Sequence, residues 1–187
     1  TNSEDGIYQA NTLRNLRVHN GKVVQCRGED RGGVSARGKN NQFDHIQAAT
    51  NYYGISPGSG SRISDCSASY NSDDGIQTSS DSKITGNTCD DNGYIGDGAG
   101  IHVTGSDNRI DSNHVTDNDR GIDVDSSGNL IIRNSASAPQ GGVNYSIVAD
   151  NRYGPIIDIT AGGTPLVSGS SASDTTATTH PWANFSF

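Results

Sequence analysis

Residues 100–125 read GIHVTGSDNRIDSNHVTDNDRGIDVD and contain one full repeat unit followed by the start of the next. A Gly-Ile pair opens the stretch at position 100 and returns at position 121. Apolar and polar residues alternate around Ile101, Ile110 and Val115, which is typical of short, half-buried β-strands. Between these segments lie Gly, Asn, Asp and Ser, which favour turns. One unit therefore predicts a few short strands joined by tight turns.

The same unit recurs over most of the chain. Gly-Ile pairs begin at Gly6, Gly54, Gly75, Gly100 and Gly121, with Gly33-Val34 as a variant. A second apolar position follows each pair, at Leu13, Phe43, Ile63, Ile84, Ile110 and Ile131. Asparagine recurs at two further positions, as Asn87, Asn113 and Asn134 and as Asn51, Asn71, Asn92 and Asn118. A single unit cannot bury its own apolar side, whereas stacked units share one continuous core.

This arrangement predicts an all-β fold, a parallel β-helix whose coils occupy residues 1–138. The isoleucines of the Gly-Ile pairs are expected to point inward. Asn87, Asn113 and Asn134 stand at an otherwise apolar position, so we expect them to form an internal ladder of hydrogen-bonded amides. Asparagine also tolerates the left-handed backbone region, so the recurrent asparagines are expected to form turns.

Residues 139–187 do not follow the repeat. The end of a β-helix exposes strand edges, which must be covered to prevent end-to-end pairing. We therefore expect this segment to be a C-terminal cap, with Trp182, Phe185 and Phe187 as apolar plugs. The alternative is that it reaches across to a neighbouring subunit, so both a monomer and a homotrimer stay open.

The composition excludes several classes of protein. The net charge is −8 and the isoelectric point is near 4.8. These values argue against a nucleic-acid partner, because a protein that binds nucleic acid presents a basic face to it. No apolar run approaches the ~20 residues of a membrane span. The three cysteines, Cys26, Cys66 and Cys89, are an odd number and are expected to be buried thiols.

The pattern G-I-x-V-x-x-S-x-x-N-x-I-x-x-N resembles the repeat of the right-handed, pectate-lyase-like β-helix superfamily, over about residues 5–137. Families with this repeat include pectate and alginate lyases, mannuronan C5-epimerases, NosD-like periplasmic proteins and phage tailspikes. The resemblance implies a right-handed coil and a secreted or cell-surface protein of bacterial type. The Asp-Pro-His-Asp motif of the epimerases is missing, so that mechanism is not carried over.

Four residues of adjacent coils form the candidate catalytic group: His102, Arg120, Asp123 and Asp74. Abstraction of the C5 proton of a uronic acid requires a base, and the enolate-like intermediate requires a cation. His102 is the candidate base, Arg120 the candidate cation and Asp123 an orienting or metal-binding group. In a hydrolase, Asp74 and Asp123 would instead act as a pair of carboxylates. The alternative is that these positions are polar only because they face water.

The candidate substrate-binding residues are Ser56 and Gln77, which precede His102 in the same outward column, together with Tyr53 and Tyr94. Tyr94 belongs to an insertion at residues 93–98, close in sequence to His102. Loops on a rigid solenoid commonly carry binding sites, and aromatic rings there can stack on sugar rings.

No cofactor is indicated, although Ca²⁺ is possible at the acidic turns. The candidate clusters are Asp73 with Asp74, Asp90 and Asp91 with Asp97, and Asp117 with Asp119. The stretch from Asp123 to Gly128 imitates the start of an EF-hand loop but has Asn134 at the twelfth position, so an EF-hand is rejected. The histidine spacing does not suggest zinc or copper, and no metal ligand is assigned.

Two functions follow from these observations. The first is the binding or processing of an extracellular, acidic polysaccharide, by a lyase-like or epimerase-like mechanism if the protein is catalytic. The second is a non-catalytic structural or adhesive module, or a tailspike-like rod. The preference for the first depends on analogy of fold.

Overall fold

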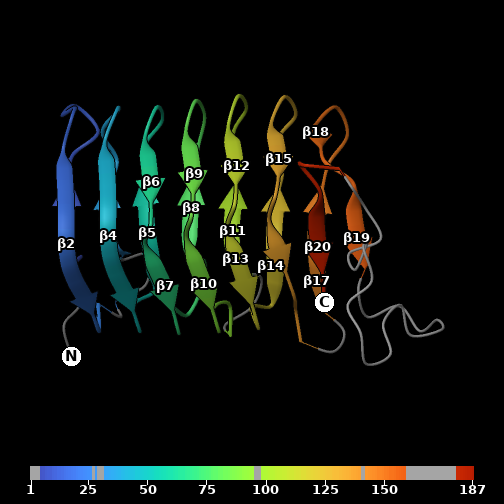
Figure 1. Ribbon diagram of the computed structural model, residues 1–187. Coiled ribbons are helices and arrows are strands. Elements are labelled where there is room, and N and C mark those ends of the chain that lie inside the picture. The colour runs from blue at the N-terminus through green and yellow to red at the C-terminus, as the bar shows by residue number, and fades with distance from the viewer. Residues whose placement is uncertain (1–4, 27, 29–31, 95–97, 140–141, 159–179) are drawn as a thin grey trace.

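The computed structural model describes residues 5–26, 28, 32–94, 98–139, 142–158 and 180–187 (Figure 1). This part of the chain contains β-strands and no helix, hence none that is long and apolar enough to cross a membrane. The strands stack in parallel, coil upon coil, into the predicted β-helix. One coil contributes a strand to each of three rows.

The first row is a seven-stranded parallel sheet. It contains β1 (Ile7–Gln9), β3 (Gly32–Ala36), β5 (Tyr53–Pro57), β8 (Ile76–Thr78), β11 (Ala99–Val103), β14 (Arg120–Val124) and β17 (Val143–Ile147). The candidate site lies on the outer side of this sheet.

The other two rows belong to one sheet, because β2 (Arg17–Val24) and β4 (Gln42–Ala49) run through both. The second row continues with β6 (Arg62–Ser64), β9 (Lys83–Thr85), β12 (Arg109–Asp111), β15 (Leu130–Ile132) and β18 (Arg152–Tyr153). The third row continues with β7 (Ser67–Ser69), β10 (Thr88–Asp90), β13 (His114–Thr116), β16 (Ser135–Ala136), β20 (Asn184–Ser186) and β19 (Ile156–Asp158).

The core is a set of stacked apolar columns inside the coils. The inward residues of the first row pair in register from Val34 and Ile55 to Ile76, Ile101 and Ile122. The second row supplies Phe43, Ile63, Ile84, Ile110 and Ile131, and all of these side chains are fully buried. Both predicted columns are confirmed over these coils.

Each coil bends at residues in the left-handed backbone region. Between the second and third rows these are His45, Asp65, Gly86, Ser112 and Arg133, all with φ between +50° and +70°. A left-handed residue interrupts the strand alternation, so that the residue after it points inward. The bend position is therefore followed by a buried residue, such as Cys66 after Asp65.

The predicted asparagine ladder follows this bend. The side-chain oxygen of Asn113 accepts hydrogen bonds from the backbone and side-chain N–H groups of Asn87, at 3.0 Å each. Asn134 does the same for Asn113, and Asn184 for Asn134. The ladder therefore exists and extends one coil beyond the predicted residues.

A second ladder joins the third row to the first. Asn51, Asn71, Asn92 and Asn118 are buried and repeat the same hydrogen bonds from coil to coil. Their expected left-handed geometry is wrong, because that conformation belongs to the preceding residue in each coil: Thr50, Tyr70, Asp91 and Asp117. The glycines of the Gly-Ile pairs face this ladder, and a Cβ at Gly75 would lie 2.8 Å from Asn92 Nδ2.

Two sequence assignments require correction at the ends. Val18, not Leu13, pairs with Phe43, and Leu13 is exposed, because the first coil is longer before its second strand. Trp182 is also exposed, so within the described residues it is not a plug. Beyond residue 138 the strands β17, β18 and β20 still extend the three rows. A capping role for residues 139–187 stays a prediction, and residues 159–179 lie outside the described part.

Loss of one ladder amide should destabilise the whole solenoid. Asn92→Ala removes the oxygen that accepts from both the backbone and the side chain of Asn71. The buried backbone N–H of Asn71 then has no partner, and its side-chain amide keeps only the bond to Ala48 O. We expect a loss of about 3 kcal/mol in the free energy of unfolding, since each unsatisfied buried group costs about 1–3 kcal/mol. Urea unfolding followed by circular dichroism measures this. Thr88→Ala, at an exposed position of the same coil, should change it by less than about 0.5 kcal/mol.

Candidate active site

His102 lies on β11 at the centre of a cluster of carboxylates. Its Nδ1 is 2.9 Å from Asp74 Oδ2 and its Nε2 is 3.0 Å from Asp125 Oδ2. The His102 side chain is 19% exposed, whereas that of Asp125 is 55% exposed. One ring nitrogen therefore faces a buried carboxylate and the other faces a carboxylate near solvent.

Asp74 is buried and its oxygens are fully engaged. Besides His102, Oδ2 accepts a hydrogen bond from Gln77 Nε2 at 2.9 Å, and Oδ1 accepts one from the backbone N–H of Ala99 at 2.8 Å. Asp5 makes the equivalent backbone bond in the first coil, to the N–H of Gly32 at 2.7 Å. Asp74 thus joins two coils and holds the His102 ring in one orientation.

Arg120 and Asp123 form a second pair on β14. Arg120 Nη1 donates to Asp123 Oδ2 at 2.6 Å, and the Asp123 side chain is 2% exposed. The other oxygen, Asp123 Oδ1, is buried and accepts no hydrogen bond from the described residues. His102 and Asp123 are paired in register on adjacent strands, so the four predicted catalytic residues lie in one group.

The carboxylates set the protonation state of His102. The hydrogen bond to Asp74, followed by weaker effects of Asp125 and Asp123, raises the pKa of His102 to about 9, although burial opposes this shift. At neutral pH the imidazole is therefore protonated and donates from both nitrogens. Abstraction of a proton by His102 would require the loss of the Nε2 proton and a free lone pair. In the state described, His102 supplies positive charge and a proton.

A hollow of about 360 Å³ opens beside this group on the same sheet. It is lined by Ser35, Arg37, Tyr53, Ser56 and Gln77. Three of the predicted substrate-binding residues therefore lie together, and Gln77 also contacts Asp74. The hollow and the His102 group are continuous through this residue.

The fourth predicted binding residue, Tyr94, lies elsewhere. Its hydroxyl is 2.7 Å from Ser72 Oγ, and it borders a separate hollow of about 280 Å³ with Asp91, Asp117 and Asp119. Residues 95–97 of the same insertion lie outside the described residues. Within that part, Tyr94 does not line the hollow beside Gln77.

Sequence reasoning did not single out Arg37 or the partnership of Asp125 with His102. Both residues stand two positions beyond the outward column that contains Ser35 and Asp123. Because successive outward residues of a strand are two apart, this second column was accessible from the alternation alone. The sequence prediction followed only the columns directly before and directly after each Gly-Ile pair, and these contain neither Arg37 nor Asp125.

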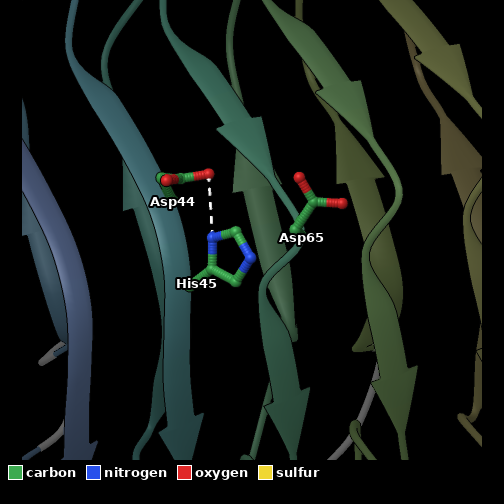
Figure 2. A group of neighbouring side chains, drawn as sticks. All are labelled: Asp44, His45 and Asp65. Carbon is green, nitrogen blue, oxygen red and sulfur yellow. Dashed lines mark ion pairs between the residues drawn. The ribbon is translucent and has the colours of Figure 1, made fainter.

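In the described part of the chain, two groups bring three metal-ligating side chains together. One is His102 with Asp123 and Asp125, and the other is Asp44 with His45 and Asp65. Figure 2 shows the second group, which comes from two adjacent coils and has an Asp44–His45 distance of 3.1 Å. The spacing of histidines in the sequence does not reveal either group, because the residues of each group come from different coils.

The predicted calcium clusters are not among these groups within the described residues. Asp74 is engaged as above, and burial together with the neighbouring Asp74 charge raises the pKa of Asp73. Asp90 Oδ1 accepts a hydrogen bond from Thr116 at 2.6 Å. Asp97 lies outside the described residues. Calcium dependence therefore stays a prediction.

The raised pKa of His102 gives a testable pH dependence. It lies above the ordinary value of about 6.5, so the stabilisation by protonated His102 is complete below about pH 6.5 and lost as the pH rises through about 9. His102→Gln should therefore be less stable than the wild type at pH 6, with a difference that shrinks toward pH 10. Urea unfolding at each pH measures this.

Nuclear magnetic resonance titration of the His102 ring should show a pKa near 9 in the wild type. Asp74→Asn should lower this pKa more than Asp125→Asn, since the bond to Asp74 is the largest cause. An unshifted His102 in the wild type would contradict the described hydrogen bonds.

The sequence also matches a known family. Residues 1–137 match the family described as the right handed beta helix region. No significant match to a curated protein or to a solved structure is found. The matched segment is more than half of the 187 residues and contains the stacked coils up to β16. The chain therefore belongs to the right-handed β-helix family.

Proposed function

We propose that this protein binds an acidic polysaccharide, outside the cell or at its surface, in the hollow over β3, β5 and β8. The observation that carries the proposal is the combination of polar, aromatic and cationic side chains around one opening of about 360 Å³ on a rigid sheet. A right-handed β-helix is consistent with such a role.

The lining of the hollow suits a sugar chain. Ser35, Ser56 and Gln77 offer hydroxyl and amide groups at the spacing of adjacent strands, about 4.8 Å. Tyr53 offers a ring that can pack on the apolar face of a sugar, and this ring is itself supported by the edge of Tyr52, with ring centroids 4.9 Å apart. These groups provide hydrogen bonds and a flat contact without a large apolar surface.

Arg37 is the reason for choosing an acidic sugar. Its side chain is exposed at the hollow and forms no ion pair with a carboxylate of the described residues. A guanidinium can hold a carboxylate with two hydrogen bonds, which gives direction as well as attraction. A uronic acid in the hollow would supply that carboxylate in a protein that is otherwise acidic.

Processing of the bound sugar is the second candidate function. It is favoured by His102, Arg120 and Asp123, which lie beside the hollow through Gln77 and Asp74. Positive charge on His102 and Arg120 would stabilise an enolate-like intermediate of a uronic acid. In an elimination the exposed carboxylate of Asp125 would take the C5 proton, the C4–O bond would break as the C4=C5 bond forms, and His102 would give its proton to the leaving oxygen. The unsaturated sugar would appear as ultraviolet absorbance.

Binding is tested with polygalacturonate, alginate and a neutral glucan, by isothermal titration calorimetry. We expect binding of a polyuronate but not of the neutral glucan. Arg37→Gln should weaken it about tenfold or more, because a hydrogen bond to a charged group contributes about 1.5–3 kcal/mol. Ultraviolet absorbance of the same mixtures, with the wild type and His102→Gln, tests processing.

Arg62→Gln is the matched control. It removes one exposed arginine from β6, on another face of the solenoid, with the same change in net charge. Equal weakening by Arg37→Gln and Arg62→Gln would point to general charge attraction and not to the hollow. If none of the sugars binds to the wild type, the proposal fails and the structural or adhesive module is favoured.

A further inference from the structure

We propose that His102, Asp123 and Asp125 bind a divalent transition-metal ion, through His102 Nε2, Asp123 Oδ1 and a carboxylate oxygen of Asp125. The inference goes beyond sugar binding and does not depend on it. It follows from the position of the three ligand atoms, from a buried oxygen without a partner, and from the residues behind each ligand.

The β-helix brings the three ligands to one point. Asp123 lies on β14 and Asp125 directly follows the end of this strand, so the two residues extend from the same side of the sheet. His102 is in register with Asp123 on the adjacent strand, β11. One ligand atom from each of the three residues lies within 4.8 Å of the other two, a spread that one metal ion can bridge.

The second observation is Asp123 Oδ1. The residue is 1% exposed and this oxygen accepts no hydrogen bond from the described residues. Burial of a carboxylate oxygen without a partner is costly, and such atoms in folded proteins commonly mark an ion or an ordered water. A cation at this point would satisfy the oxygen with the strongest partner available to it.

The groups behind the ligands have the arrangement of a metal site's outer shell. Asp74 holds Nδ1 of His102, so that Nε2 is directed to the ligand group. Without a metal Nε2 donates its proton to Asp125, and metal binding releases this proton to solvent. Arg120 holds Oδ2 of Asp123, so that Oδ1 is the oxygen left for a ligand. Metal-binding histidines usually donate their second ring N–H to a carboxylate in this way. Each of these two ligands is therefore held from behind by a residue outside the ligand group.

The donor set indicates the kind of ion. One imidazole and two carboxylates suit Zn²⁺ or Mn²⁺, whereas Ca²⁺ takes six to eight oxygen ligands. Three protein ligands also leave room for water or for a substrate oxygen.

The group at Asp44, His45 and Asp65 provides a natural contrast (Figure 2). It has the same residue types, but His45 and Asp65 are exposed, and no buried oxygen without a partner is found among its described atoms. Asp44 Oδ1 is already occupied by His45 and by Ser64. This group therefore has the same three residue types but no buried carboxylate oxygen that is left without a partner. For this reason His45→Gln is the matched control.

The experiment is calorimetric titration of the chelator-treated, dialysed protein with Zn²⁺, Mn²⁺ and Ca²⁺ in the absence of sugar. We expect one equivalent of Zn²⁺ or Mn²⁺ to bind, and the melting temperature to rise with its concentration. Asp123→Asn should abolish this binding and His45→Gln should leave it unchanged.

A second measurement needs no variant and so tests the proposal even if Asp123→Asn fails to fold. In the wild-type protein, bound Zn²⁺ should shift the His102 ring resonances and prevent their titration, while those of His45 stay unchanged. Binding of Ca²⁺ alone, or equal loss of binding in His45→Gln and Asp123→Asn, would overturn the proposal. Absence of any metal binding would overturn it too and would leave the sugar-binding proposal unaffected.

Discussion

The rest of this structure depends on the hydrogen bond that a backbone N–H group of one coil donates to an asparagine side-chain oxygen of the next coil. The ladders that contain Asn92 and Asn113 lie inside the solenoid at two bends of each coil. Backbone N–H groups at bends cannot join the strand ladders, and in a buried position they need another acceptor. The amides supply it, so a chain with few large apolar residues can still bury its turns. The ladders also fix the register of the strands, because each asparagine amide can reach only the equivalent position of the neighbouring coil.

This register also decides what the outer surface can carry. A residue placed after a Gly-Ile pair lies about 4.8 Å from its equivalent in the next coil, which is close enough for side chains to share a ligand. Gln77, His102 and Asp123 follow one another in this way. Outward side chains therefore lie at a fixed spacing along the sheet. A substitution at one of these positions changes the functional groups on the surface and leaves the buried core unchanged. The hollow lined by Arg37 and the carboxylates around His102 therefore lie side by side on one sheet.

The charges around His102 are concentrated in one small group. Three aspartates surround one histidine and one arginine, and the carboxylates attract positive charge strongly enough to raise the pKa of His102 to about 9. Asp74 is explained by its backbone bond to Ala99, which Asp5 repeats in the first coil. The second oxygen of Asp123 accepts no such bond from the part of the chain that the structure describes. Gln9 Oε1 and Thr78 Oγ1 on the same sheet are also buried without a partner among the described residues, but only Asp123 adds a charged carboxylate next to a histidine and a second aspartate.

The sequence by itself determined the parallel β-helix, the inward isoleucines and the ladder through Asn87 and Asn113, because these depend on a local period that repeats with little change. It also brought His102, Arg120, Asp123 and Asp74 to one region, since coil spacing follows from the same period. Only the tertiary structure decided that Val18 replaces Leu13 in the first coil and that Trp182 is exposed. Only the tertiary structure shows that Tyr94 lies away from the hollow beside Gln77 and that Asp125 contacts His102. These features depend on how far a side chain reaches and which way it turns after a bend, and a period in the sequence carries no information about either.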